Sequence, residues 1–411
     1  MNGHCHFLIH IEGIYGMNPS DSSHRPSQQS QTTCSNGPNA ITIEKSKSLT
    51  ATLLRRRNKM VTQHEAWLSL TKEEPLEPAL PICDPHHHLW DYPDSFPESR
   101  VRESARPVRH YLLEHLLKDT GGGHNIVQTV FIECGSMYKK DGPPEMQPVG
   151  QTEFVQGIAA QSASGQYGNT AVAAGIVGFA DLMRGSAVAP VLEAHIAASR
   201  NRFRGIRFTT TWNASPDVSS RVNTPNLLSD PKLREGFAQL HKYNLSFDGF
   251  LYFPQLPGLV DLARAFPDTT IITNHIGGPL GVGPYAGKRE EVFREWKQGI
   301  TALSACPNVV VKLGGMGMPR TGFGWHAMPK PPDSAELAKD MAPYYIWCIE
   351  KFGTKRCMFE SNFPVDRTSY SYTVIWNAFK RITKDFSPTE RADLFHDTAA
   401  RVYRLPSVVS Q

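Results

Sequence analysis

Asp84-Pro85-His86-His87-His88-Leu89-Trp90-Asp91 closes a short apolar run that begins near residue 81 and is typical of a buried β-strand. Side chains alternate between the two faces of a strand, so His86 and His88 point the same way and His87 points the other way. Two imidazoles on one face of a rigid strand can bind one divalent cation. An isolated His-x-His pair more often makes ordinary hydrogen bonds at a polar strand end. The rest of the chain therefore decides between the two interpretations.

From residue 81 onward the chain repeats a short apolar run, a polar or glycine-rich end and a helix-like stretch. Alternating strands and helices predict parallel strands joined by right-handed crossovers, and eight such units close into a (β/α)₈ TIM barrel. A doubly wound open sheet is the alternative, but no Gly-x-Gly-x-x-Gly motif follows the first strand, as a dinucleotide-binding fold would require. We expect strands at residues 81–88, 126–134, 171–179, 203–209, 245–252, 269–275, 308–313 and 356–361, and helices at 188–200, 231–242, 256–265, 289–305, 335–352 and 388–403.

Composition narrows the class of protein further. The 411 residues are 40% hydrophobic and 20% charged, with a net charge of +4, which suits a barrel with a large core. Lys and Arg are scattered, so a nucleic-acid partner is not expected, and no apolar run approaches the roughly 20 residues that cross a bilayer. The seven cysteines include no Cys-x-x-Cys pair, which argues against a disulfide framework or a zinc finger. These features predict a cytoplasmic protein.

Residues 1–60 differ in character from the rest of the chain. The stretch 18–52 is rich in Ser, Gln, Thr and Asn and poor in large apolar residues, which predicts a disordered N-terminal extension before a barrel at residues 80–405. Arg55-Arg56-Arg57 and the scarcity of acids leave mitochondrial targeting open. The alternatives are an untargeted tail and a true start at Met60.

Polar side chains follow nearly every predicted strand at its C-terminal end. Active sites of TIM barrels lie at that end, whereas polar residues that only satisfy the core would be spread along the strands. The grouping of polar residues at the C-terminal ends of the strands therefore indicates one site at the barrel mouth. Its candidate residues are His86, His88, Glu133, Arg207, His275, Lys312, Glu360 and Asn362, with Asp366 shortly after.

Three ordered motifs resemble those of the amidohydrolase-related family often called amidohydrolase family 2. They are Asp84-x-His86-x-His88, Thr273-Asn274-His275-Ile276-Gly277-Gly278-Pro279 and Met358-Phe359-Glu360-Ser361-Asn362-Phe363-Pro364-Val365-Asp366. Within the family the chain is most similar to the sugar-lactone and 2-pyrone-4,6-dicarboxylate lactonase branch. The resemblance implies a (β/α)₈ barrel that hydrolyses C–O or C–N bonds or removes a carboxyl group without oxidation.

The resemblance also implies roles for individual residues. His86 and His88 would bind a metal or polarise a carbonyl group, and His275 would complete that cluster or orient the nucleophilic water. Lactone hydrolysis also needs an activated water and an electrophile at the carbonyl oxygen, which Zn²⁺ bound by His86, His88 and either Glu133 or His275 would supply. Catalysis without metal stays open, because protonated histidines could polarise the carbonyl instead. The wider superfamily has a basic aspartate where this chain has Asn362, and an amide cannot accept the proton.

Another acid must then act as general base. Asp366 ranks first, ahead of Glu133 and His275, because it lies just beyond the motif that has lost its acid. The alternative for Asp366 is a carboxylate that caps a helix beginning near Tyr370.

A glycine-rich loop follows the seventh predicted strand, beginning Gly314-Gly315-Met316-Gly317 and continuing to Trp325 and His326. Such a loop suits a substrate lid in which Trp325 and His326 bind substrate, or a packing loop in which Trp325 covers helices. Arg207 and Lys312 would bind an anionic or polyhydroxylated substrate, or would instead pair with Glu133 or Glu360.

These observations predict a hydrolase that opens a lactone or a related activated carbonyl compound. A non-oxidative decarboxylase and a catalytically weak small-molecule-binding barrel are the alternatives, the latter because of Asn362 and Phe253 at strand ends. A small molecule is the expected partner, and a homo-oligomer is compatible with the sequence.

Overall fold

Eight parallel strands form the central sheet of the computed structural model, which describes residues 63–93, 95–97, 99, 101, 105–106 and 108–407. The predictions for residues 1–60 lie outside this range. Neighbouring strands in the sheet are neighbours in the sequence, and every pair is parallel. The strands are β1 (Pro81–His87), β4 (Asn125–Ile132), β5 (Ala171–Gly178), β6 (Phe203–Thr209), β7 (Ser246–Phe250), β8 (Ile271–Thr273), β9 (Val309–Leu313) and β10 (Cys357–Phe359).

Polar contacts between β1 and the end of β10 bring the two edges of the sheet together. The backbone NH of Asn362 donates a hydrogen bond to the carbonyl oxygen of His86 over 3.0 Å. The backbone NH of His88 donates to the carbonyl oxygen of Phe363 over 2.8 Å. The buried carboxylate of Asp84 accepts hydrogen bonds from the Ser361 hydroxyl at 2.5 Å and backbone NH at 3.0 Å. Eight parallel strands whose first and last members meet in this way confirm the predicted TIM barrel.

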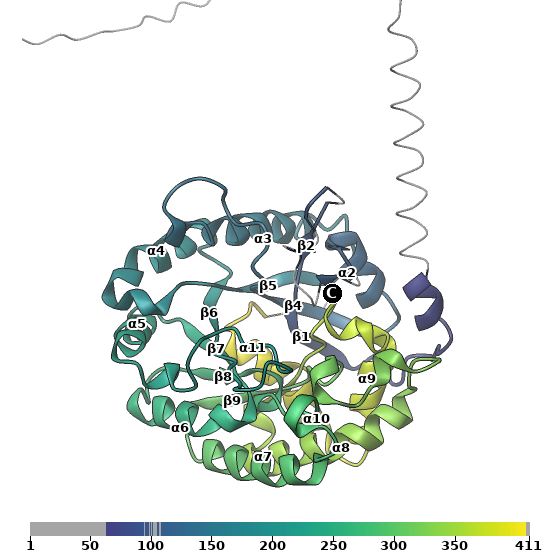
Figure 1. Ribbon diagram of the computed structural model, residues 1–411. Coiled ribbons are helices and arrows are strands. Elements are labelled where there is room, and N and C mark those ends of the chain that lie inside the picture. The colour runs from purple at the N-terminus through teal and green to yellow at the C-terminus, as the bar shows by residue number, and fades with distance from the viewer. Residues whose placement is uncertain are drawn as a thin grey trace, which may run out of the picture. The chain divides into compact units, whose positions relative to one another are not determined.

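Helices cover the outside of the barrel, as Figure 1 shows, because each strand is apolar on its outer face and must be buried there. A short antiparallel pair, β2 (Trp90–Asp91) and β3 (His110–Tyr111), lies outside the barrel sheet. The helices are α2 (Leu113–Thr120), α3 (Val149–Ser162), α4 (Ala189–Ala198), α5 (Pro231–Lys242), α6 (Leu256–Ala265), α7 (Arg289–Ser304), α8 (Ser334–Phe352), α9 (Tyr372–Ile382), α10 (Pro388–Ala392) and α11 (Thr398–Val402). None of the helices in the described ranges is long and apolar enough to cross a membrane.

Several strands end earlier than the sequence predicts. The sixth was expected to reach residue 275, but β8 ends at Thr273, and the last was expected to reach residue 361, but β10 ends at Phe359. In both cases the polar residues at the C-terminal end leave the hydrogen-bonded ladder. His275 has a φ of 52° and Asn362 a φ of 55°, conformations incompatible with a strand. The prediction therefore extended these strands into the segments that carry the site.

The barrel interior contains both apolar and ionisable side chains. Val310 belongs to an inner cluster that packs against α11, whereas Val309 and Val311 of the same strand pack against the surrounding helices. Lys312, two residues after Val310, is fully buried and pairs with Asp248 of β7. A charged layer therefore lies between the apolar lower part of the barrel and its mouth.

Candidate active site

The three consecutive histidines at the end of β1, His86 to His88, point alternately to the two sides of the strand. His87 points away from the site, with Nε2 2.8 Å from the Thr129 hydroxyl oxygen and its ring against Phe131. The rings of His86 and His88 lie together, with centroids 4.9 Å apart. The alternation expected from the sequence is present, and it follows a register shift between Asp84 and His87 in the pairing of β1 with β4.

His275 joins this pair from the turn that follows β8. The turn, Asn274–Gly277, contains left-handed backbone at His275 and Ile276 as well as at Gly277. This rare conformation for non-glycine residues is typical of sites where the fold holds a functional side chain in place. It directs the His275 ring to 4.7 Å from the ring of His86, measured between centroids.

Glu360, the residue directly after β10, connects the two histidines. Its Oε2 lies 2.6 Å from Nδ1 of His86 and its Oε1 lies 2.7 Å from Nδ1 of His275. Each residue offers one ligand atom, and these atoms lie within 4.8 Å of one another in a buried cluster. Within the described part of the chain, Oε2 has no hydrogen-bond partner despite its short contact with His86. Two imidazoles and a carboxylate that converge in this way suit a divalent cation such as Zn²⁺.

Burial controls the charge of the cluster. It lowers the pKa of His86 and of His275 well below the usual value for histidine, helped by the nearby Lys312 at His86 and Arg320 at His275. Both imidazoles are therefore neutral at neutral pH, as metal ligands must be. Burial raises the pKa of Glu360 to about 8, against the opposing effect of Lys312. A cation bound by the cluster would favour the ionised carboxylate.

His88 contributes a third neutral imidazole beside the cluster. Its Nδ1 lies 2.8 Å from the carbonyl oxygen of Ile132, and because a carbonyl can only accept, Nδ1 carries the proton. Burial, followed by the charge of Arg207, lowers the pKa of His88 well below its usual value. Its Nε2 therefore has a free lone pair on a side chain that lines the cavity described below. A lone pair held in this way can accept a proton from water or bind a metal.

Both cations predicted to bind substrate are paired with buried carboxylates. The Nε of Arg207 lies 2.9 Å from Oε1 of Glu133, and the Nζ of Lys312 lies 2.9 Å from Oδ1 of Asp248. Glu133 is thus engaged by Arg207 rather than placed within the histidine and glutamate cluster. Each cation also approaches His86, with Arg207 Nη1 3.4 Å from Nε2 and Lys312 Nζ 3.3 Å from Nδ1.

Asp366 lies behind Asn362 and is held by three hydrogen-bond donors. Its Oδ1 accepts from Asn362 Nδ2 at 2.7 Å, and its Oδ2 accepts from the Tyr370 hydroxyl at 2.7 Å and the Gly317 NH at 3.0 Å. Asn362 lines the cavity and Asp366 does not. These contacts indicate that Asp366 orients the side-chain amide of Asn362. The role of Asp366 as general base stays a prediction.

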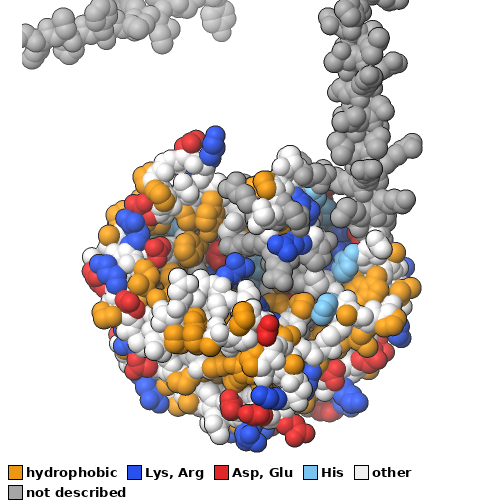
Figure 2. All heavy atoms as spheres, in the orientation of Figure 1, with side chains coloured by type: hydrophobic (Ala, Val, Ile, Leu, Met, Phe, Trp, Pro, Cys, Tyr) orange, Lys and Arg blue, Asp and Glu red, His pale blue; other side chains and the backbone are white. Residues whose placement is uncertain are grey.

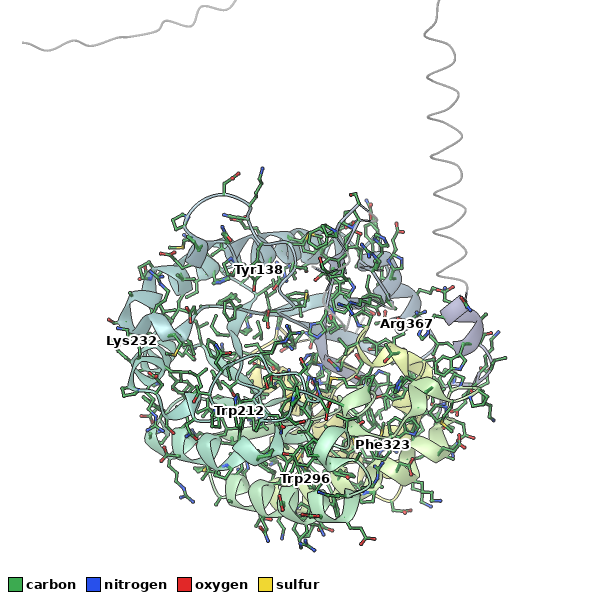
Figure 3. All side chains as sticks on the ribbon, viewed as in Figure 1. Tyr138, Trp212, Lys232, Trp296, Phe323 and Arg367 are labelled. Carbon is green, nitrogen blue, oxygen red and sulfur yellow. The ribbon has the colours of Figure 1, made fainter. Side chains whose placement is uncertain are left out.

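The glycine-rich loop after β9 passes directly against the cluster. A Cβ atom on Gly315 would lie 2.3 Å from Nδ1 of His275, and one on Gly314 would lie 2.3 Å from Cγ of Glu360. Glycine therefore allows the backbone to support two candidate ligands at close range. Further along the loop, Trp325 is 4% exposed and stacks on Phe323, labelled in Figure 3, whereas His326 lines the cavity.

Replacing Gly315 by alanine is expected to weaken zinc binding by about 10- to 100-fold, because the added methyl group must displace the His275 ring. Gly287→Ala is the matched control, since Gly287 has the same φ of 73° but a Cβ atom added there would meet no atom within 4 Å. Competition with a chromogenic chelator measures both affinities. Equal affinities in the two variants would contradict the supporting role of Gly315.

His275 of the cluster lines a cavity of about 630 Å³ at the C-terminal ends of the strands, whereas His86 and Glu360 are fully buried beside it. His88, Arg207, His275 and Asn362 line it, together with aromatic residues such as Phe250. Figure 2 shows basic and histidine side chains near the middle of the molecule in this view. A cavity of this size accommodates a small organic molecule.

Glu360 and Asp248 are the main members of the site that reasoning from the sequence left without a role. The sequence places Glu360 at the barrel mouth but indicates no role for it beyond that of an ion-pair partner, and Asp248 lies in a strand with little polar character around it, Ser246–Phe250. The signal for Glu360 was its position at the end of the last strand beside Asn362. Nothing in the sequence pairs Asp248 with Lys312, because the two residues are 64 positions apart.

Comparison with known proteins agrees with this architecture. The amidohydrolase family profile matches residues 83–405, so the chain belongs to the amidohydrolase family. The Sinorhizobium fredii protein y4mH is 34% identical over 332 residues, covering 79% of this chain and 98% of the relative. An L-fucono-1,5-lactonase from Burkholderia ambifaria is 26% identical over 285 residues, covering 66% of this chain and 87% of the relative.

A solved structure shows the same fold. The amidohydrolase from Burkholderia multivorans superimposes with a TM-score of 0.61 at 22% identity, covering 79% of this chain and 99% of that protein. A second crystal form of that protein contains bound zinc.

Proposed function

We propose that this protein is a hydrolase that opens a lactone or a similarly activated cyclic ester. The observation that carries the proposal is the buried cluster of His86, His275 and Glu360 in an amidohydrolase barrel, with His275 lining a cavity that accommodates a small molecule. Sequence similarity to L-fucono-1,5-lactonases supports a lactone as the substrate class. The zinc in the related barrel supports Zn²⁺ as the cation that the cluster binds.

The reaction adds water across the ring ester bond. The water oxygen forms a bond to the carbonyl carbon, the bond from that carbon to the ring oxygen breaks, and a water proton passes to the departing ring oxygen. The product is an open-chain hydroxy acid that releases one proton at neutral pH. A zinc ion held by His86, His275 and Glu360 would polarise the carbonyl oxygen and lower the pKa of water.

The chain's own residues supply the remaining requirements. We assign the Nε2 lone pair of His88 to orient the attacking water, because its Nδ1 proton is fixed on Ile132. With a cation bound to the cluster, Glu360 would carry the negative charge that Asn362 lacks, and it lies next to both histidines. Asn362, fixed by Asp366, offers an amide oxygen or NH₂ group to the substrate. Arg207, paired with Glu133, provides positive charge near the oxygen on which negative charge develops.

Purified protein without a histidine tag is expected to bind about one zinc per chain and to release protons from 1,5-lactones of sugar acids. Metal analysis and a pH-indicator assay measure these two properties, and a His86→Ala variant is the control. Loss of carbon dioxide from an aromatic carboxylic acid without lactone opening would favour a decarboxylase. Substrate binding with no turnover in wild-type protein would favour the binding-protein alternative.

A further inference from the structure

We infer that Arg320 is the receptor for a carboxylate on the substrate, so that the lactone opened by this protein carries a free acid group away from its reacting carbonyl. This inference rests on the proposed function. It arises because the structure pairs Arg207 and Lys312, the two cations expected from the sequence to bind an anion, with internal carboxylates and places Arg320 in the cavity wall. The following observations support it.

The two cations expected from the sequence to bind an anion are already neutralised. Arg207 contacts Glu133, and Lys312 contacts Asp248, each over 2.9 Å in a buried setting. Arg320 makes no ion pair within 4.0 Å with any acid in the described part of the chain. Of the described residues that line the cavity, Asp217 alone has a carboxylate, and it is exposed.

Arg320 is held in a defined position without a carboxylate. Its guanidinium carbon lies 4.6 Å from the centre of the Phe250 ring and 5.8 Å from that of the Tyr252 ring. Stacking on these rings and a contact of Nη2 with the Met318 sulfur restrict the side chain while leaving other N–H donors for a ligand. The Tyr252 hydroxyl is itself fixed, since it donates to the carbonyl oxygen of Ser219 over 2.6 Å. Such preorganisation lowers the entropy lost on binding.

Arg320 also lies on the cavity side of the candidate ligands. The Phe250 ring under its guanidinium is 5.0 Å from the His275 ring, measured between centroids. A substrate with its carbonyl at the histidine and glutamate cluster would therefore extend past Phe250 to reach Arg320. One half-buried guanidinium offers a planar fork and a single positive charge, which match one carboxylate.

Two lactones that differ only in the acid group test the inference. D-glucono-1,5-lactone and D-glucaro-1,5-lactone share the ring and its hydroxyls, but the second has a carboxylate in place of the hydroxymethyl group. Wild-type protein is expected to prefer the carboxylated lactone in kcat/KM. Arg320→Met should reduce that preference by about 10- to 100-fold, mainly through KM, since a charged hydrogen bond is being removed. Arg320→Lys should restore part of it by keeping the charge.

Arg294→Met is the matched control, because Arg294 is an exposed arginine on α7 and its loss changes the net charge equally. Equilibrium binding of D-glucarate, measured by calorimetry, provides a readout that requires no turnover. If neither lactone is hydrolysed but glucarate binding depends on Arg320, the proposed reaction is wrong, and the inference that Arg320 binds a carboxylate is supported. If wild-type and Arg320→Met proteins show the same ratio of kcat/KM and the same glucarate affinity, the inference is overturned.

Discussion

Glu360→Gln is expected to reduce lactone hydrolysis by about 10²- to 10⁴-fold, the range typical when an acid or base group is removed from an active site. Glutamine keeps the size of the side chain but loses the charge between His86 and His275. The same substitution should weaken zinc binding, since an amide is a poorer ligand than a carboxylate for this cation. Turnover at saturating zinc and zinc affinity at equilibrium separate the two effects.

The variant Asp366→Asn tests whether another acid acts as the general base. Asp366 accepts hydrogen bonds from three donors, so an amide at this position would present its own NH₂ group to one of them and disturb Asn362. We expect a smaller loss of kcat than in Glu360→Gln, with zinc affinity unchanged. If Asp366→Asn instead lowers kcat by about 10²- to 10⁴-fold while Glu360→Gln retains most activity, Asp366 is the general base, as the sequence alone suggested.

Lys312→Met is expected to lower the free energy of unfolding by about 3–5 kcal/mol, because it leaves the buried carboxylate of Asp248 without its counter-charge. Asp248 also accepts hydrogen bonds from Tyr403 and Asn274, so it cannot move to solvent without breaking them. Urea unfolding of metal-free protein measures the loss. A change below 1 kcal/mol would show that the pair is not needed in the barrel interior.

Two further variants identify the cause of that loss. Lys312→Met combined with Asp248→Asn should recover much of the stability, because the amide keeps an oxygen for the Tyr403 hydroxyl and carries no charge. Lys139→Met removes a half-exposed partner of Glu153 and should change the free energy of unfolding by less than about 1 kcal/mol. If the double variant is as unstable as Lys312→Met alone, the loss comes from altered packing rather than from the unpaired charge.

The sequence by itself determined the architecture of the barrel. Short apolar runs alternating with amphipathic stretches allow few folds, and the eight strands lie where those runs occur, from Pro81–His87 to Cys357–Phe359. The sequence also determined that His86 and His88 share a face, because side-chain alternation is a local property of a strand. Strand ends were less well predicted, since residues such as His275 leave the ladder for left-handed backbone.

Only the tertiary structure decided which charged groups are paired. Arg207, Lys312 and Arg320 are equivalent cations in the sequence, yet the first two contact Glu133 and Asp248, while the third lines the cavity without an acidic partner in the described part of the chain. Glu360 likewise acquires its place between His86 and His275 only when β1, β8 and β10 meet at the barrel mouth. Such pairings join residues far apart in the chain, and they depend on distances of a few ångströms that local patterns of polarity do not encode.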